Sequence, residues 1–285
     1  MLGPAKERVL RALRRYFYLT AIQVGLACGY SPRSITHVQT QLKELADLGY
    51  ALRLFLPRPS QHGSAPSVYC LARRGLNHLR AEGLDVTARY RPSERQETHL
   101  HLSHTLCLND WLISIELACH RVSQIELAGL AHERQLKRRL ASGREVGDGS
   151  VVPDAWLDLR LRGTYQMPLV VELDRSTEEQ RKWRRKVRLL VGWAHGAYRQ
   201  AFGTDSITIL VVTTGGERRL STLLRWTEQE LASLGREEAE LFRLTTFTRE
   251  RQVPEDIFFR PLWRVPFAEE AVCLLDRQAL LPPVP

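Results

Sequence analysis

The chain has 285 residues, of which 44% are hydrophobic and 26% charged, a composition that excludes disordered, fibrous and low-complexity proteins. No apolar run approaches the roughly 20 residues that cross a bilayer, and the charged start of the chain does not suit a signal peptide. The five cysteines are scattered and form no CxxC pair, which argues against a disulfide scaffold or a cysteine-rich zinc site. We therefore expect a two-domain protein of the cytoplasm.

The charge is distributed unevenly along the chain. Lys and Arg number 41 against 32 Asp and Glu, a net charge of +9. Residues 1–92 hold 14 of the basic and 5 of the acidic side chains, so the whole excess lies in the first third of the chain. A compact basic domain indicates a polyanionic partner, most often nucleic acid, although a basic surface can also serve solubility alone.

The first third of the chain, residues 1–92, has the pattern of a winged helix-turn-helix domain. Thr20 and Ser31 are typical helix N-caps, and Pro32 suits a first helical position. The apolar spacing predicts three helices, at 4–17, just after Thr20 and at 32–48. Two strands follow at 50–56 and 68–71, around a tip rich in Pro, Gly and Ser, and a closing helix covers 72–82. This order places the third helix where it can enter a major groove.

The exposed face of the third helix carries side chains that can donate to phosphates or to base edges. With one arginine in the hairpin tip, the predicted DNA-binding residues are Arg33, Ser34, Thr36, His37, Thr40, Gln41 and Arg58. We expect double-stranded DNA as the partner. The alternative is a winged helix that contacts protein.

Residues 93–250 alternate between helical and strand patterns, which predicts an α/β domain with a mixed sheet flanked by helices. The predicted helices cover 94–120, 178–195 and 217–234, and residues 176–180 offer capping-box pairs at the start of the second. The predicted strands cover 125–138 and 151–161, which a polar hairpin joins, and 168–174, 206–213 and 241–246. We expect the tail, residues 251–285, to pack on this core.

Three acidic residues mark the candidate chemistry of this domain. Asp154 opens one predicted strand, and Glu172 and Asp174 close the next, on one face of it. Carboxylates at the ends of neighbouring strands repel one another unless a cation joins them, and hard oxygen ligands suit Mg²⁺ or Mn²⁺. The alternative is that these acids cap the following helix or pair with nearby arginines.

The segments PDAWLDL and VVELDRSTEEQRKWRRKV contain these acids, 18 residues apart. Their pattern resembles that of PD-(D/E)XK nucleases and, after a winged helix, is similar to the replication-relaxation family of plasmids and mobile elements, over about residues 5–215. The resemblance implies a restriction-endonuclease-like core and a role in replication or DNA relaxation. The expected partners, besides DNA, are a second copy of the chain in a homodimer and other replication or mobilisation proteins.

One position departs from the nuclease pattern, because Asp174 stands where the pattern has lysine. Only five of the 41 basic residues are lysines, and two of them, Lys182 and Lys186, lie in the following helix. Lys186 matches the helix lysine of the resemblance. We predict that the Lys186 ammonium approaches Glu172 within a few ångströms. The predicted catalytic set is Asp154, Glu172, Asp174 and Lys186, with the three acids as metal ligands.

Two hypotheses follow. The first is a DNA-binding protein of a mobile element with a Mg²⁺- or Mn²⁺-dependent DNA-cleaving domain. The second is a non-catalytic DNA-binding regulator or replication accessory with a degenerate nuclease fold.

Overall fold

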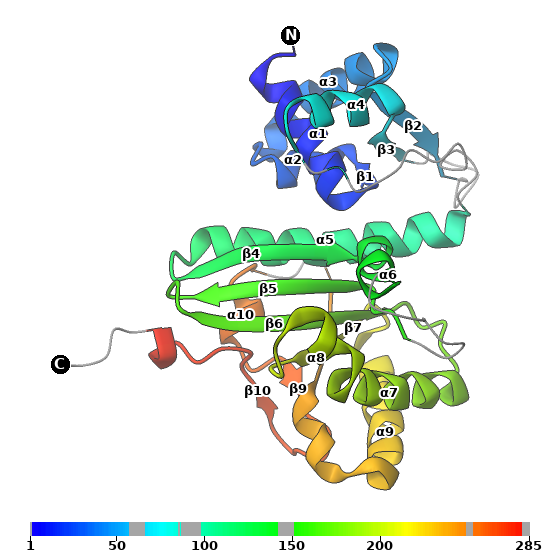
Figure 1. The fold of residues 1–285 in the computed structure, drawn as a ribbon, viewed down its shortest axis with the longest axis vertical. Coiled ribbons are helices and arrows are strands. Elements are labelled where there is room, and N and C mark those ends of the chain that lie inside the picture. The colour runs from blue at the N-terminus through cyan, green and yellow to red at the C-terminus, as the bar shows by residue number, and fades with distance from the viewer. Residues whose placement is uncertain are drawn as a thin grey trace, which may run out of the picture. The chain divides into compact units, whose positions relative to one another are not determined.

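The computed structural model describes residues 2–56, 66–84, 86, 98–141, 151–248 and 253–280 (Figure 1). The chain divides into two compact units, Met1–Ile113 and Ser114–Pro285. The predicted boundary at residue 92 lies outside the described residues, and so does Arg58. The α/β fold class is confirmed, because helices accompany a three-stranded and a seven-stranded sheet. Among the described residues, every helix is too short or too polar to cross a membrane.

The first unit is mostly helical, with a small antiparallel sheet in the order β1-β3-β2. Val9, Leu10, Leu13, Val38 and Leu42 are buried and form part of its core. Its elements are α1 (Pro4–Tyr16), β1 (Leu19–Thr20), α2 (Ala21–Ala27), a 3-10 turn η1 (Pro32–Ser34), α3 (Ile35–Asp47), β2 (Ala51–Phe55), β3 (Ser67–Leu71) and α4 (Arg73–Ala81).

Local signals explain where these helices start and stop. Thr20 caps α2 with a capping box. Its side-chain oxygen accepts from the backbone amide of Gln23, and the Gln23 side-chain oxygen accepts from the backbone amide of Thr20. Gly29 and Gly49 have positive φ angles of 71° and 74°, as turns after helices require. The predicted third helix begins differently, because Ser31 caps the 3-10 turn η1 before α3 begins at Ile35.

The helix α5 (His99–Arg121) contains the division between the units. Its first half is bound to the first unit by buried polar side chains. Asn109 donates to the carbonyl oxygens of Tyr16 and Tyr18, at 2.9 and 2.7 Å. Gln23 donates to the Leu106 carbonyl at 2.8 Å, so α5 up to Ile113 belongs to the core of the first unit.

The second unit is built on a seven-stranded sheet in the order β10-β9-β8-β7-β6-β5-β4. The pairs β4–β5 and β5–β6 are antiparallel, whereas β6–β7 and β7–β8 are parallel. The strands are β4 (Ile125–His132), β5 (Ala155–Leu161), β6 (Tyr165–Asp174), β7 (Thr208–Thr213), β8 (Phe242–Thr246), β9 (Trp263–Arg264) and β10 (Ala271–Val272).

The helices α7 (Gln180–His195), α8 (Ala197–Phe202) and α9 (Gly216–Leu234) cover one face of this sheet (Figure 1). Leu136 also packs into the core on this face. Trp156, Val170 and Val211 point from the strands into the core beneath the helices. Trp183 of α7 is fully buried there and donates through its indole nitrogen to Thr227 of α9, at 3.0 Å, which joins the two helices.

The structure corrects several predicted elements. The predicted strand over 125–138 ends at His132 and continues as α6 (Glu133–Ala141), because ERQLKRRLA consists of strong helix formers. The predicted strand over 151–161 begins only at Ala155, and the hairpin before it, except Ala141, lies outside the described residues. The sequence reading missed α8. The tail supplies α10 (Asp256–Phe259), the edge strands β9 and β10 and the 3-10 turn η5 (Gln278–Leu280), while η3 (Arg236–Leu241) precedes β8.

Candidate functional site

The strand pair β5–β6 brings two of the predicted acids together. The register pairs Ala155 with Val171, so Asp154 stands opposite Glu172. The backbone amide of Asp154 donates to the Val171 carbonyl oxygen at 3.1 Å, and the Asp154 carboxylate accepts from the backbone amide of Leu173 at 2.8 Å. Because side chains alternate along a strand, Asp154 and Glu172 lie on the face of the sheet that α7 covers. Glu172 is buried, whereas Asp154 is half-buried.

Lys186 of α7 completes a cluster of charges around Glu172. Its ammonium lies 3.1 Å from Glu172 Oε2 and 3.2 Å from Glu178 Oε1. The side chain of Lys186 is 26% exposed and that of Glu172 only 3%, so the pair lies at the margin of the core. The predicted approach of Lys186 to Glu172 is therefore confirmed. Lys182, one turn earlier, lies on the surface 3.9 Å from Glu179.

The surroundings keep Lys186 positively charged. Burial by itself lowers the pKa of its ammonium, but the carboxylates of Glu172, Asp154 and Glu178 more than offset this and raise the pKa above its ordinary value. The contribution of Asp154 means that its carboxylate also acts on the same ammonium. At neutral pH the site therefore holds one fixed cation among three acidic side chains.

Asp174 has different partners from Glu172, although both lie on the same face of β6. Its fully buried carboxylate accepts from Arg219 at 2.9 and 2.7 Å, from the Thr213 hydroxyl at 2.8 Å and from the Ser176 amide at 3.0 Å. Burial by itself raises the pKa of Asp174, but the hydrogen bonds from Arg219, Thr213 and Ser176 lower it below its usual value. Asp174 is thus a carboxylate held by a guanidinium.

Arg219 and Glu178 connect the two charge clusters. Besides binding Asp174, Arg219 of α9 donates to the backbone carbonyl of Glu178 at 2.8 Å. This bond holds the backbone just before α7 in place. The Glu178 side chain from the same segment accepts from Lys186. The predicted capping box within residues 176–180 is wrong, since α7 begins after Glu179 and has no side-chain cap. Sequence reasoning missed Arg219, which no local pattern distinguishes from the other arginines.

The predicted metal ligands do not form one open cluster. Within the described residues, no group of three or more His, Cys, Asp or Glu side chains is arranged to hold a metal ion. Both oxygens of Asp174 are bonded to Arg219, which leaves Asp154 and Glu172 as the carboxylates beside Lys186.

In the first unit, most of the predicted DNA-binding side chains are at the surface. Arg33, Thr36, His37 and Thr40 are exposed, and Ser34 is half-buried.

Gln41 does not share their exposed face, contrary to the prediction. It is only 7% exposed, and its amide nitrogen lies 2.6 Å from His37 Nε2. It lies next to Leu42 on the helix and therefore at the border of the apolar face, where packing buries it.

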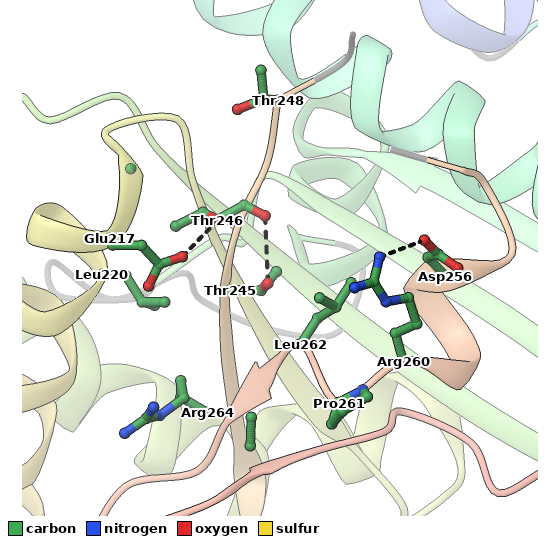
Figure 2. Close-up of a pocket in the computed structure, with 12 residues that line it drawn as sticks. Glu217, Leu220, Thr245, Thr246, Thr248, Asp256, Arg260, Pro261, Leu262 and Arg264 are labelled. Atoms are coloured by element: carbon green, nitrogen blue, oxygen red, sulfur yellow. Dashed lines mark hydrogen bonds and ion pairs between the residues drawn. The ribbon is translucent and has the colours of Figure 1, made fainter. Parts of the chain in front are cut away.

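A cavity of about 520 Å³ lies elsewhere in the second unit, between the start of α9, the end of β8 and the tail (Figure 2). Its charged side chains are balanced. Arg260 pairs with Asp256 at 3.1 Å, and Glu217 accepts from the Thr246 hydroxyl at 3.3 Å (Figure 2). None of the predicted site residues lines this cavity.

The sequence matches a known family model. The model of the family described as replication-relaxation matches residues 10–202, which include both charge clusters except Thr213 and Arg219. The chain belongs to the replication-relaxation family. The family indicates a role in the replication or relaxation of plasmids and other mobile elements. The comparison with curated proteins gives no match.

Proposed function

We propose that the protein binds duplex DNA of a mobile element through its first unit. The order of α1, α2, α3, β2, β3 and α4 is the order of a winged helix-turn-helix, in which α3 is the recognition helix. The exposed Arg33, Thr36, His37 and Thr40 are donors suited to phosphates and base edges. The excess of basic residues in this part of the chain supports the same assignment.

The proposed activity of the second unit is metal-dependent hydrolysis of a phosphodiester bond in DNA. The observation that carries this proposal is the Lys186 ammonium, 3.1 Å from the buried Glu172 and under the influence of Asp154. Two acids and a lysine are the groups that the PD-(D/E)XK pattern requires. Here the lysine comes from α7, and Asp174 at the usual lysine position is bound by Arg219 instead.

The donor set fits Mg²⁺ or Mn²⁺ held by two carboxylates. Mg²⁺ in proteins commonly binds one or two carboxylates and takes its other ligands from water and substrate phosphates. Asp154 and Glu172 would hold the ion, whereas Asp174 would position Arg219 and the segment before α7. A bound ion would lower the pKa of a water molecule and neutralise charge on the phosphate. Lys186 would orient the scissile phosphate and stabilise its developing negative charge.

The second candidate function is a DNA-binding replication accessory without catalysis. The observation that favours it is the pairing of Lys186 with both Glu172 and Glu178, which can be a purely structural arrangement. In that case the core would serve protein contacts or dimerisation.

A plasmid relaxation assay separates the two functions. Supercoiled plasmid is incubated with the full chain and Mg²⁺ or Mn²⁺, alongside Asp154→Asn, Lys186→Ala and the matched surface variant Lys137→Ala. We expect nicked or linear DNA with the wild-type protein and Lys137→Ala, and none with the other two variants. Absence of cleavage by a wild-type protein that binds the plasmid would favour the accessory. Melting temperatures in chelator check that each variant is folded.

A further inference from the structure

The helix α7 carries an unusual concentration of positive charge for the second unit. Between Gln180 and His195 it has six Lys or Arg residues and no Asp or Glu. The neighbouring α9, between Gly216 and Leu234, has three arginines and three glutamates. An exposed helix face that is merely solvated usually carries charges of both signs, as α9 does.

Half of the α7 charge is used inside the unit. Arg184 and Arg188 both bind the fully buried Glu230 of α9, Arg184 Nε at 2.9 Å from Oε2 and Arg188 Nε at 2.8 Å from Oε1. Lys186 is bound by Glu172 and Glu178. These three side chains hold α7 in place and explain half of its charge.

The other three side chains, Arg181, Lys182 and Arg185, are exposed, and we refer to them as the α7 basic stripe. In the part of the chain that the structure describes, neither Arg181 nor Arg185 has an ion pair. The contact of Lys182 with Glu179, at 3.9 Å between side chains 69% and 75% exposed, stabilises little. Arg181 and Arg185 are four residues apart, where like charges destabilise a helix. The described contacts of the stripe therefore contribute little to the stability of the fold.

The position of the stripe relates it to the candidate site. Lys182 precedes Lys186 by one helical turn, so the exposed stripe borders the side chain that reaches Glu172. Arg181 to Arg185 covers about 6 Å along the helix axis, at about 1.5 Å per residue. One strand of a duplex presents a phosphate charge per about 3.4 Å of the axis, so about two phosphates of a strand fall within the length of the stripe.

We propose that the α7 basic stripe is a second DNA-binding surface, which contacts the phosphate backbone of a duplex beside the Asp154–Glu172–Lys186 group. This inference rests on the proposed function, since it takes duplex DNA as the partner. It adds that the second unit, which has 26 basic and 24 acidic side chains over residues 114–285, contributes its own phosphate contacts.

The test measures binding of the full chain to a labelled duplex by fluorescence anisotropy, in chelator, as a function of salt concentration. The variants are Arg181→Glu/Arg185→Glu and, as a matched control with the same charge change, Arg160→Glu/Arg277→Glu, which alters two exposed arginines elsewhere. Each phosphate contact adds about 0.9 to the slope of log affinity against log salt. We expect the stripe variant to lose about 2 units of slope and about tenfold or more in affinity, and the control to change neither.

Repeating both variants in an Arg33→Glu background isolates the second unit, because the residual affinity should then depend on the stripe. Unchanged slope and affinity in the stripe variant, or an equal loss in the control variant, would overturn the inference. The inference would also be overturned if the stripe variant lost affinity for a carboxylate polyanion such as polyglutamate but kept its full affinity for DNA. Plasmid cleavage is scored separately, so a stripe that binds DNA in a protein that does not cut leaves this inference standing while the proposed activity fails.

Discussion

Replacement of Asp174 by asparagine tests whether this carboxylate is a structural partner of Arg219. The side chain of Asp174 is fully buried and that of Arg219 is 13% exposed, so the change leaves a guanidinium without its counter-charge inside the unit. Removing one partner of a buried ion pair costs about 3–5 kcal/mol. We expect the free energy of unfolding of the second unit to fall by about 3 kcal/mol at neutral pH.

The loss should depend on pH in a defined direction. The hydrogen bonds of Asp174 lower its pKa, so its stabilising contribution is present above the ordinary aspartate value of about 3.9 and is lost as pH falls through the lowered value. Wild type and Asp174→Asn should therefore differ most near neutrality and converge in strong acid. Urea unfolding followed by tryptophan fluorescence measures this, since five of the six tryptophans lie in the second unit.

Two controls sharpen the measurement. Asp205→Asn breaks the exposed pair with Arg199 and should cost less than about 1 kcal/mol. The double variant Asp174→Asn/Arg219→Met should recover much of the lost stability, because it removes the uncompensated charge. A loss below about 1 kcal/mol for Asp174→Asn alone, at a pH where wild-type Asp174 is ionised, would refute the reasoning.

Four further predictions follow from described contacts. Arg33→Glu should weaken duplex binding and reduce its salt dependence, measured by anisotropy; retention of full affinity would contradict a DNA contact at the turn η1 that precedes α3. Glu230→Gln should lower the melting temperature of the second unit, because Arg184 and Arg188 lose their buried partner, and calorimetry would detect it. Gly75→Ala should destabilise the first unit by about 1–3 kcal/mol in spite of the better helix propensity, since the new Cβ would lie 2.2 Å from the Tyr50 carbonyl oxygen; a neutral effect in calorimetry would contradict the packing of α4. Because the pKa of Lys186 is raised, its stabilising contribution should be complete below the ordinary lysine value of about 10.4 and should decline as pH rises from there through the raised value; in alkaline unfolding experiments the stability difference from Lys186→Met should shrink over that range, and a constant difference would contradict the ion pair.

Features encoded by neighbouring residues were predictable from the sequence. The start of α2 depends on Thr20 and Gln23, three residues apart, and their capping box appears in the structure. The predicted approach of Lys186 to Glu172 depended on the match of Lys186 to the helix lysine of the family resemblance, on the scarcity of lysine and on the short connection between β6 and α7. Glu172 and Lys186 are 14 residues apart, so a single strand-to-helix connection decides whether they meet.

Features encoded by distant residues were not predictable. Asp174 and Arg219 are 45 residues apart and meet only because β6 and β7 pair in parallel and α9 follows β7. Gln41 lies at the border of an apolar helix face, where tertiary packing rather than helical spacing decides burial. The end of β4 at His132 reflects helix propensity in α6 overriding an apparent strand pattern.

The separation of the two charge clusters along the chain affects how they assemble during synthesis. Asp154, Glu172 and Lys186 belong to one hairpin and the helix after it, whereas Arg219 is translated 33 residues after Lys186. At about 5–20 residues per second, that delay is about 2–7 s. During this interval the nascent chain contains Asp154, Glu172 and Lys186, whereas Asp174 still lacks its guanidinium partner and α7 still lacks its partners Thr227 and Glu230. The end of β6 can therefore take its final form only once α9 has been made.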